Sequence, residues 1–242
     1  MSEFLHLSLR SRDRDRTSEW YGKNFGFEER RRGTTGIGTQ TAVLVHPSSN
    51  TYIEVSDRVK LGHDFEIPEE AIMLRFTVPD MGAAYQRFQT NGANITEGDA
   101  DSEYIFLEDA DGYEVEVGRG EGDVTFSSIG IRVSDLDKSA DFYKEHLGFQ
   151  EKRRWTTPRG TNIAVLELPG NPTTLALRQM PFLTSKLEIP ENLMHLAFPV
   201  ASMPRFREEM AAKGVDVDPD GERMSWVLDP DGYEWEMIER RT

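Results

Sequence analysis

An internal repeat constrains the fold of this chain more than any other feature. Shifting the 242-residue sequence by 122 positions places DRDRTSEWYGKNFGF (Asp13–Phe27) over DLDKSADFYKEHLGF (Asp135–Phe149). The match continues without gaps through most of each half, as expected for a duplicated unit rather than a chance motif. The sequence therefore predicts two homologous halves, residues 1–121 and 122–242, joined at the glycine-rich stretch GRGEGD.

Each half ends on the same acidic turn and strand, DADGYEVEV at Asp109–Val117 and DPDGYEWEM at Asp229–Met237. Glycine in the turn adopts positive φ without steric cost, and the following residues alternate between two faces. Glu116 and Glu236 therefore share one face of their strands, away from the large apolar side chains. This pattern is typical of a solvated hairpin, and it equally suits a carboxylate that faces a cleft.

Each half also contains a smaller repeat. An alternating strand (Phe4–Arg10) leads to a helix (about Thr17–Phe25) and further strands, and the pattern restarts with a strand at Ile72–Val78 and a helix at Met81–Asn91. The second half repeats both patterns. The predicted fold class is α+β, built from four βαβββ units. Two loops rich in proline and acid separate units and are expected to act as linkers or lids, Asp57–Glu70 and Met180–Asn192.

Composition excludes several kinds of function. The chain has 28 basic and 43 acidic residues, a net charge of −15, which opposes binding to nucleic acid. No apolar run is long enough for a membrane span, and the first residues lack a secretory signal, so a cytoplasmic protein is expected. Because there is no cysteine, a metal would have to be held by histidine and carboxylate.

Several short segments resemble one family. WYGKNFGF, FYKEHLGF, NGANITEG and DPDGYEWE are similar to segments of the vicinal oxygen chelate superfamily, which includes glyoxalase I, bleomycin resistance proteins and extradiol dioxygenases. The resemblance covers almost the whole chain. It implies that βαβββ units pair to form half-barrel clefts, so that this chain is a tandem member with two clefts.

The resemblance also implies where a metal would bind, because the family takes one ligand from each first strand and one from each last strand. Pairing consecutive units leaves both clefts incomplete. Pairing the first unit with the fourth gives one full set, and the inner units are left with a set that holds a metal poorly. The outer set is His6, Glu54, His195 and Glu236, and the inner set is Met73, Glu116, Ser128 and Ala176.

A lone histidine on a strand is usually a hydrogen-bonded core residue. Two histidines and two glutamates at aligned positions favour a metal site instead, and the sequence predicts that outer units pair with outer and inner with inner. The three remaining histidines, His46, His63 and His146, are expected at the surface.

The outer set suits one divalent metal, Ni, Zn, Co, Fe or Mn. By resemblance to glyoxalase I, the chain is expected to be a lyase or isomerase that moves a proton on a small hydroxy-carbonyl compound, including thiol adducts, chelated through adjacent oxygens. Glu236 would be the base and Glu54 its pseudo-symmetric partner. Burial of Glu236 against Trp226, Tyr233 and Trp235 is expected to tune its proton affinity.

Two further positions concern the substrate. Arg10 lies four residues after His6, where glyoxalase I has an arginine that binds a carboxylate of glutathione, and Trp226 is expected beside the base. Arg58 and Glu191, however, replace an asparagine and an arginine of the glutathione site. The expected partner is therefore a small-molecule substrate of open identity, and the protein is expected to be a monomer or a homodimer.

Two alternatives remain open at this point. An extradiol Fe(II) dioxygenase would use two histidines and a glutamate, but Trp226 and Phe106 occupy the place of its tyrosine, and Ser128 replaces the first-strand histidine of the second half. A non-catalytic binding or resistance protein would use the same clefts without metal, holding flat apolar or cationic ligands between aromatic side chains.

Overall fold

The computed structural model describes residues 6–35, 38–49, 51–58, 62 and 64–239. Four βαβββ units follow one another, as predicted. The first comprises β1 (His6–Ser11), α1 (Arg14–Phe25), β2 (Glu28–Thr34), β3 (Gln40–Val45) and β4 (Tyr52–Asp57). The second comprises β5 (Ile72–Val78), α2 (Met81–Thr90), β6 (Asn94–Glu97), β7 (Tyr104–Glu108) and β8 (Glu114–Arg119).

The second half repeats this order. The third unit comprises β9 (Thr125–Arg132), α3 (Leu136–Leu147), β10 (Gln150–Thr156), β11 (Asn162–Glu167) and β12 (Thr174–Gln179). The fourth comprises β13 (Met194–Val200), α4 (Met203–Ala212), β14 (Asp218–Asp220), β15 (Met224–Leu228) and β16 (Glu234–Glu239). None of the helices in the described part of the chain combines the length and apolar character needed to cross a bilayer.

Helix α1 begins three residues earlier than the sequence pattern indicated. The Asp13 side chain accepts hydrogen bonds from the backbone N–H groups of Asp15 and Arg16, which satisfies donors that a helix start leaves free. The helix ends at Gly26, whose φ of 78° is readily available only to glycine. The polar run before Thr17 therefore belongs to the helix, because the cap lies upstream of the apolar positions.

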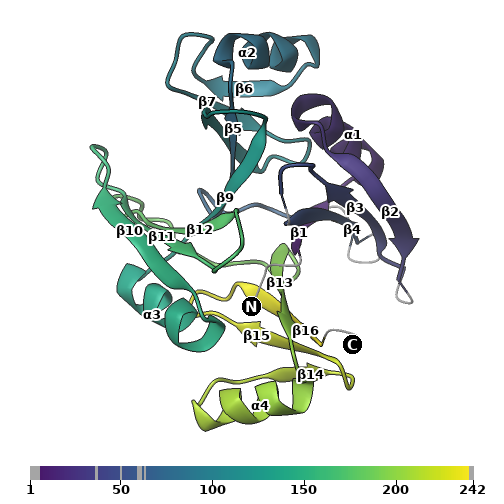
Figure 1. The fold of residues 1–242 in the computed structure, drawn as a ribbon, viewed down its shortest axis with the longest axis vertical. Coiled ribbons are helices and arrows are strands. Elements are labelled where there is room, and N and C mark those ends of the chain that lie inside the picture. The colour runs from purple at the N-terminus through teal and green to yellow at the C-terminus, as the bar shows by residue number, and fades with distance from the viewer. Residues whose placement is uncertain (1–5, 36–37, 50, 59–61, 63, 240–242) are drawn as a thin grey trace.

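The strands form two eight-stranded sheets, and each sheet combines units from both halves of the sequence. One has the order β14-β15-β16-β13-β1-β4-β3-β2, the fourth unit beside the first; the other has the order β10-β11-β12-β9-β5-β8-β7-β6, the third beside the second. Figure 1 shows the purple β1 next to the yellow-green β13. The predicted pairing of outer with outer and inner with inner units is the one observed.

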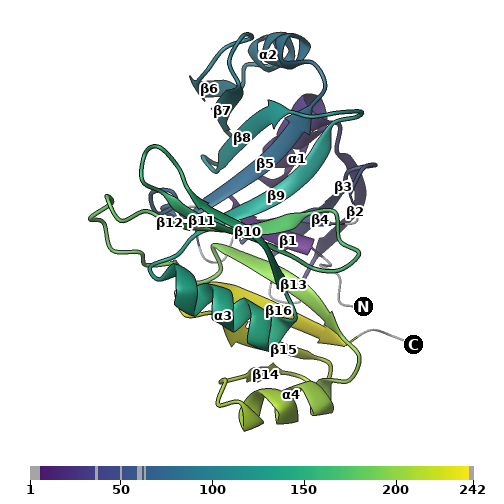
Figure 2. The same cartoon turned by 60° about the vertical axis from the view of Figure 1, so that its left-hand side comes forward.

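Helix packing, in contrast, stays within each sequence half. Phe25 of α1 stacks on Phe76 of β5 with ring centroids 4.0 Å apart. In the second half Tyr143 of α3 packs against Trp235 of β16 at 5.2 Å. Because these rings are buried, the core of each half crosses from one sheet to the other. The helices lie on the outer side, with α2 and α4 at opposite ends of the molecule (Figure 2).

The repeated acidic turn connects the two sheets. Asp109 Oδ1 accepts hydrogen bonds from three backbone N–H groups of its own turn, those of Asp111, Gly112 and Tyr113. The Tyr113 hydroxyl then lies 3.0 Å from the carbonyl oxygens of both Arg10, in β1 of the other sheet, and Leu193, directly before β13 of that sheet. The motif DxDGY therefore shapes a turn and also fixes the crossing point of the sheets.

The equivalent turn in the second half makes the corresponding contacts, here from the outer sheet to the inner one. The Tyr233 hydroxyl lies 2.8 Å from the carbonyl oxygen of Ala71 and 3.0 Å from that of Arg132. Asp229 accepts a hydrogen bond from the Tyr143 hydroxyl of α3, as Asp109 does from Tyr21 of α1 at 2.8 Å. A buried hydroxyl–carboxylate bond thus ties each first helix to the last strand of its own half.

One histidine assignment from the sequence is wrong. His46 is buried, with 5% of its surface exposed, because Phe27 packs against its ring at 5.1 Å and its Nδ1 lies 2.7 Å from the Ser48 hydroxyl. Burial lowers the pKa of His46, so the ring is neutral at pH 7. His146 is partly buried on α3, and His63 lies outside the described residues.

Candidate metal centre

The register of the outer sheet places four potential ligands on one face. β1 and β13 run antiparallel with Ser8 opposite His195 and His6 opposite Ala197, so the two histidines are diagonal neighbours. β4 places Glu54 opposite Ser8, and β16 places Glu236 opposite Ala197. Side chains alternate along strands, so all four point to the concave side.

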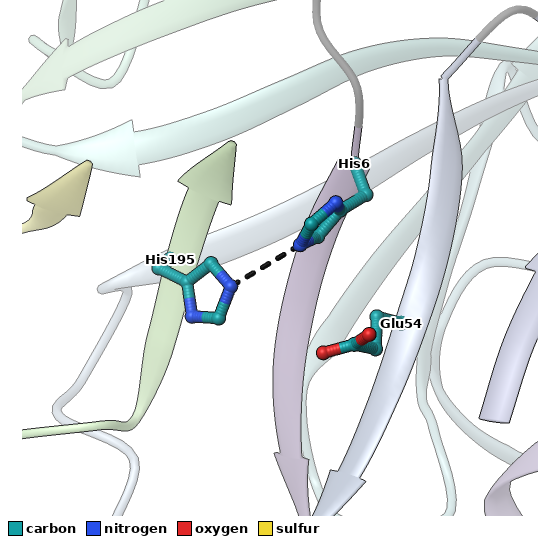
Figure 3. Close-up of side chains that lie close together, drawn as sticks. All are labelled: His6, Glu54 and His195. Carbon is teal, nitrogen blue, oxygen red and sulfur yellow. Dashed lines mark hydrogen bonds between the residues drawn. The ribbon is translucent and has the colours of Figure 1, made fainter. Parts of the chain in front are cut away.

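The side chains meet as the register requires. His6 Nε2 and His195 Nε2 are 3.2 Å apart, and Glu236 Oε2 is 3.4 Å from the first and 3.5 Å from the second. His6, Glu54 and His195 each offer one ligand atom within 4.8 Å of the others. Figure 3 shows the two imidazole rings pointing toward each other and the Glu54 carboxylate directed to the same space from the neighbouring strand.

These separations fit a shared divalent ion. Ligand atoms about 2.0–2.2 Å from one ion lie about 3.0–3.5 Å from each other at bond angles between octahedral and tetrahedral. The three distances among His6, His195 and Glu236 fall in that range. The set of two imidazole nitrogens and two carboxylates suits a metal of intermediate hardness. The residues present therefore fit the group that the sequence predicts.

The protonation states also suit a cation. Burial lowers the pKa of His195, and the neighbouring His6 acts in the same direction, so the ring is neutral near pH 7. Burial alone would raise the pKa of Glu236, but the hydrogen bonds with His195 and His6 outweigh it and hold that pKa at about 2. The site thus presents neutral imidazole and ionised carboxylate, the forms that bind metals.

Aromatic rings bound the cluster on both sides. Trp226 lies opposite Glu236 on β15, and its ring meets the His195 ring edge-on with centroids 5.1 Å apart. Tyr52 lies opposite His6 on β4 and stacks on that ring at 5.2 Å. Tyr52 was missed in the sequence, although its position two residues before Glu54 puts it on the same face.

Two expected neighbours of Glu236 lie elsewhere. Tyr233 and Trp235 are fully buried and sit at odd spacing from Glu236, so they pack under the helices instead. Side chains alternate between the two faces of a strand, so the sequence DPDGYEWEM already implied that these two residues face away from Glu236. Of the three aromatic residues expected around the base, only Trp226 lies on the cleft side.

Arg10 is held by the loop that follows β4. It is buried, its Nη2 donates a hydrogen bond to the carbonyl oxygen of Gly62 at 3.1 Å, and its guanidinium lies 4.8 Å from the Phe65 ring centroid. Arg132, its equivalent in the third unit, binds Glu69 and Ser185 in the two linker loops. Both arginines therefore attach loops to the sheets, and a role for Arg10 in substrate binding stays a prediction.

The inner units form a second cleft, and its residues are those the sequence grouped. Met73, Glu116, Ser128 and Ala176 all line one cavity of about 310 Å³. Glu116 Oε1 lies 2.9 Å from Arg75 Nε. Among the described residues, none of the inner cleft belongs to a group of side chains close enough to share a metal ion. Arg153 and Arg178 also line it, and neither was predicted from the sequence.

Comparison with known proteins agrees with this architecture. The sequence model of the glyoxalase/bleomycin resistance protein/dioxygenase superfamily matches residues 3–117 and again residues 125–237. The chain belongs to this superfamily. It does so as a tandem member, with one match in each half.

Individual proteins similar to this chain include named glyoxalases. A lactoylglutathione lyase of Arabidopsis thaliana is 27% identical over 168 residues, covering 64% of this chain and 58% of the relative, so the match spans little more than half of that relative's length. A glyoxalase I mutant from Zea mays matches in structure with a TM-score of 0.82 at 22% identity, covering 99% of this chain and 92% of the other.

A second kind of relative shares the fold. A putative dioxygenase from Bacillus subtilis matches with a TM-score of 0.73 at 14% identity, covering 99% of this chain and 86% of the other. At these identities the structural matches establish the architecture alone. The chain is therefore a glyoxalase-like member of the superfamily, and its reaction must be argued from its own site.

Proposed function

We propose that this protein is a divalent-metal-dependent lyase or isomerase that moves a proton on a small hydroxy-carbonyl compound. The observation that carries the proposal is the convergence of His6, Glu54, His195 and Glu236 in one cleft, with the two Nε2 atoms 3.2 Å apart. A divalent ion held by these four residues would polarise a substrate carbonyl as a Lewis acid, which makes the adjacent C–H more acidic.

The protein side chains supply the remaining parts. Glu236 is ionised across the physiological pH range and is the base that accepts the α-proton, as expected by resemblance to glyoxalase I. Glu54 approaches from the opposite side of the histidine pair, on β4, and can take part in returning a proton. Trp226 and Tyr52 form apolar walls that limit access of water to the carboxylates.

The first substrate to test is S-lactoylglutathione, the compound in the name of the Arabidopsis relative. Two substitutions argue for testing other hydroxy-carbonyl compounds beside it. Arg58 is half-buried near Glu54 and Glu234, and Glu191 is exposed on the loop before β13. Both differ in charge or size from the residues of the glutathione site, so a smaller or differently charged thiol adduct suits this cleft.

A direct test follows the proton rather than a particular product. The metal-loaded protein is incubated in deuterium oxide with a set of hydroxy-carbonyl compounds, and exchange at the α-carbon is followed by NMR. We expect exchange with at least one compound, abolished by a chelator and restored by Ni, Co, Zn, Mn or Fe. Exchange that is unaffected by chelation would contradict a metal-dependent reaction.

A second candidate is an extradiol-type Fe(II) dioxygenase, which one observation favours. His6, His195 and Glu54 form the compact group of three, and two histidines with one carboxylate is the ligand set of non-haem iron oxygenases. Trp226 in place of a tyrosine acid counts against it. Oxygen uptake by the Fe(II)-loaded protein with catechol compounds would support this alternative, whereas α-proton exchange without oxygen uptake supports the lyase.

The partners proposed here are small molecules and no nucleic acid, in keeping with the net charge of −15. If the protein binds no divalent ion under any of these conditions, the result would instead support a third candidate function, binding of small molecules without catalysis.

A further inference from the structure

The inner cleft differs from the outer cleft in its charge as well as in its lack of a full set of metal ligands. Its strand registers match those of the outer cleft, with Gly130 opposite Ala176 where the outer sheet has Ser8 opposite Glu54. Equivalent positions in the two clefts can therefore be compared one by one. At three such positions the inner cleft has a larger or charged residue, with Arg75, Arg178 and Trp155 in place of Ala197, Ser56 and Gly33.

Arg75 is the first of these residues. It lies on β5 opposite Glu116 of β8 and opposite Ser128 of β9. Its equivalent in the outer sheet is Ala197, whose small side chain leaves space between His6 and Glu236. In the inner cleft the Arg75 guanidinium enters this region and pairs with Glu116 at 2.9 Å. A fixed cation of the protein thus takes the region that could hold a metal in the outer cleft.

Arg178 is the second. It replaces Ser56, is only 4% exposed, and lines the cavity beside Gly130. Its Nη1 contacts Glu70 Oε2 at 3.0 Å and its Nη2 donates to the Glu70 carbonyl oxygen at 2.8 Å. Its buried Nε has no hydrogen-bond partner among the described residues. A Cβ added at Gly130 would come within 3.1 Å of that Nε, so glycine leaves room beside the guanidinium.

Arg153 and Trp155 form the mouth of the cavity on β10. The Arg153 guanidinium lies 4.5 Å from the Trp155 ring centroid, an arrangement that keeps a cation over an aromatic face. Arg153 is exposed and forms no ion pair with any residue that the structure describes. Ile163 and Val165 of β11 add an apolar wall beside Trp155.

The cavity therefore combines excess positive charge with an apolar wall. Three arginines line it against one glutamate, and Glu70 offsets Arg178 from the adjacent loop. This local excess stands out in a chain whose net charge is −15. Buried arginine donors that lack a full set of acceptors favour carboxylate or phosphate oxygens.

We propose that the inner cleft is a binding site for a small organic anion with a flat apolar body, separate from the metal centre. The anionic group would meet the Arg178 Nε and Arg75, and the apolar body would lie along Trp155, Ile163 and Val165. The site needs no metal, and its ligand differs in charge from the cationic ligands that the fold's aromatic clefts can also hold.

The test uses three probes of one shape and different charge: 2-naphthoate, 2-naphthamide and 2-naphthylmethylammonium. Each is titrated into the full-length protein by calorimetry. We expect 2-naphthoate to bind with one molecule per chain and at least tenfold tighter than the amide, and the ammonium probe to bind more weakly still. Equal affinities, a preference for the ammonium probe, or no binding of 2-naphthoate at millimolar concentration would overturn the proposal.

Matched variants locate the site. Arg153→Gln removes a surface cation at the mouth of the inner cleft, and Arg31→Gln removes its equivalent beside the outer cleft. Ala176→Leu fills the cavity without changing charge. Arg153→Gln should weaken 2-naphthoate at least fivefold and Ala176→Leu should abolish binding, with Arg31→Gln having no effect on it. Loss of binding in Arg31→Gln but not in Arg153→Gln would place the anion in the outer cleft and refute the proposal.

Discussion

His6 Nε2 lies 3.2 Å from His195 Nε2, although 189 residues separate the two histidines in the chain. The contact exists because β1 pairs with β13, the first strand of the first unit with the first strand of the last. Neither half of the sequence contains both histidines. The candidate metal centre therefore depends on the exchange of units between the two sheets, and a change that disturbs this pairing would remove the site.

Replacing Glu236 with glutamine should separate proton transfer from metal binding. The amide keeps an oxygen near the two histidines but accepts a proton poorly, and a general base contributes about 10²–10⁴-fold to the rate. We expect α-proton exchange to fall by about 100-fold or more while most of the bound ion is retained. Glu239→Gln, on the same strand near its end, is the control. Normal exchange by Glu236→Gln would assign the base to another residue.

Trp226 should affect substrate binding more than the chemical step. Its ring borders His195 and lies opposite Glu236, so Trp226→Ala removes a wall of the cleft without removing a ligand. Loss of about 1.4 kcal/mol of contact raises KM about tenfold. Steady-state kinetics should show this rise with a smaller change in kcat, and Trp226→Phe should be intermediate. Phe106→Ala, the equivalent change in the inner sheet, serves as the control, and a similar rise in KM there would indicate a general effect on folding.

The two buried tyrosine–aspartate bonds should stabilise the fold independently of the site. Tyr21→Phe leaves Asp109 without its hydroxyl donor, and Tyr143→Phe does the same to Asp229. Each is expected to cost about 1–3 kcal/mol in the free energy of unfolding, measured with urea. Tyr85→Phe is a suitable control because no hydrogen bond of that hydroxyl occurs among the described residues. Metal content should be unchanged in all three variants.

Asp109 should make stability depend on pH. Burial raises its pKa from 3.8 to about 7, and the nearby Asp111 acts in the same direction. A carboxyl whose folded-state pKa is raised stabilises the fold below its unfolded pKa, and this contribution is lost as pH rises through the folded value. The contribution is therefore lost between about pH 4 and pH 7.

The isosteric variant Asp109→Asn cannot ionise, so its unfolding free energy should fall less than that of the wild type over this range. Asp229 has a pKa raised to about 6, again mainly by burial, so Asp229→Asn should remove a dependence confined to about pH 4–6. Urea titrations at half-unit pH steps would measure both. Parallel pH profiles for the wild type and Asp109→Asn would show that Asp109 is already ionised at low pH in the folded protein.

The repeat made much of this architecture predictable from sequence. Equal spacing of the four units fixed the strand order within each unit, and the placement of His6, Glu54, His195 and Glu236 at aligned positions predicted which units pair. Period-two alternation then placed these four side chains on one face. The strand order and the shared face rest on local geometry and internal homology, whereas the ligand positions that indicated the pairing came from the resemblance to the superfamily.

Long-range contacts were harder to predict from the sequence. The burial of His46 depends on Phe27, which packs on it from the connection between α1 and β2. The contacts of Arg10 with the loop after β4, and the role of Arg178 in the inner cleft, depend on loops whose paths no periodicity encodes. Arg178 had a usable signal, since it lies two residues after Ala176 on the same strand face, as Tyr52 lies two before Glu54.

The central claim is most directly tested by counting bound metal. Protein purified without chelator and then loaded with Ni, Zn, Co, Mn or Fe in turn would be analysed by mass spectrometry of its elements, together with His6→Ala, His195→Ala and the inner-cleft variant Met73→Ala. The account predicts one divalent ion per chain in the wild type and in Met73→Ala, and none in either histidine variant. An ion that persists in either histidine variant, or a wild type that binds no ion with any of the five metals, would contradict it.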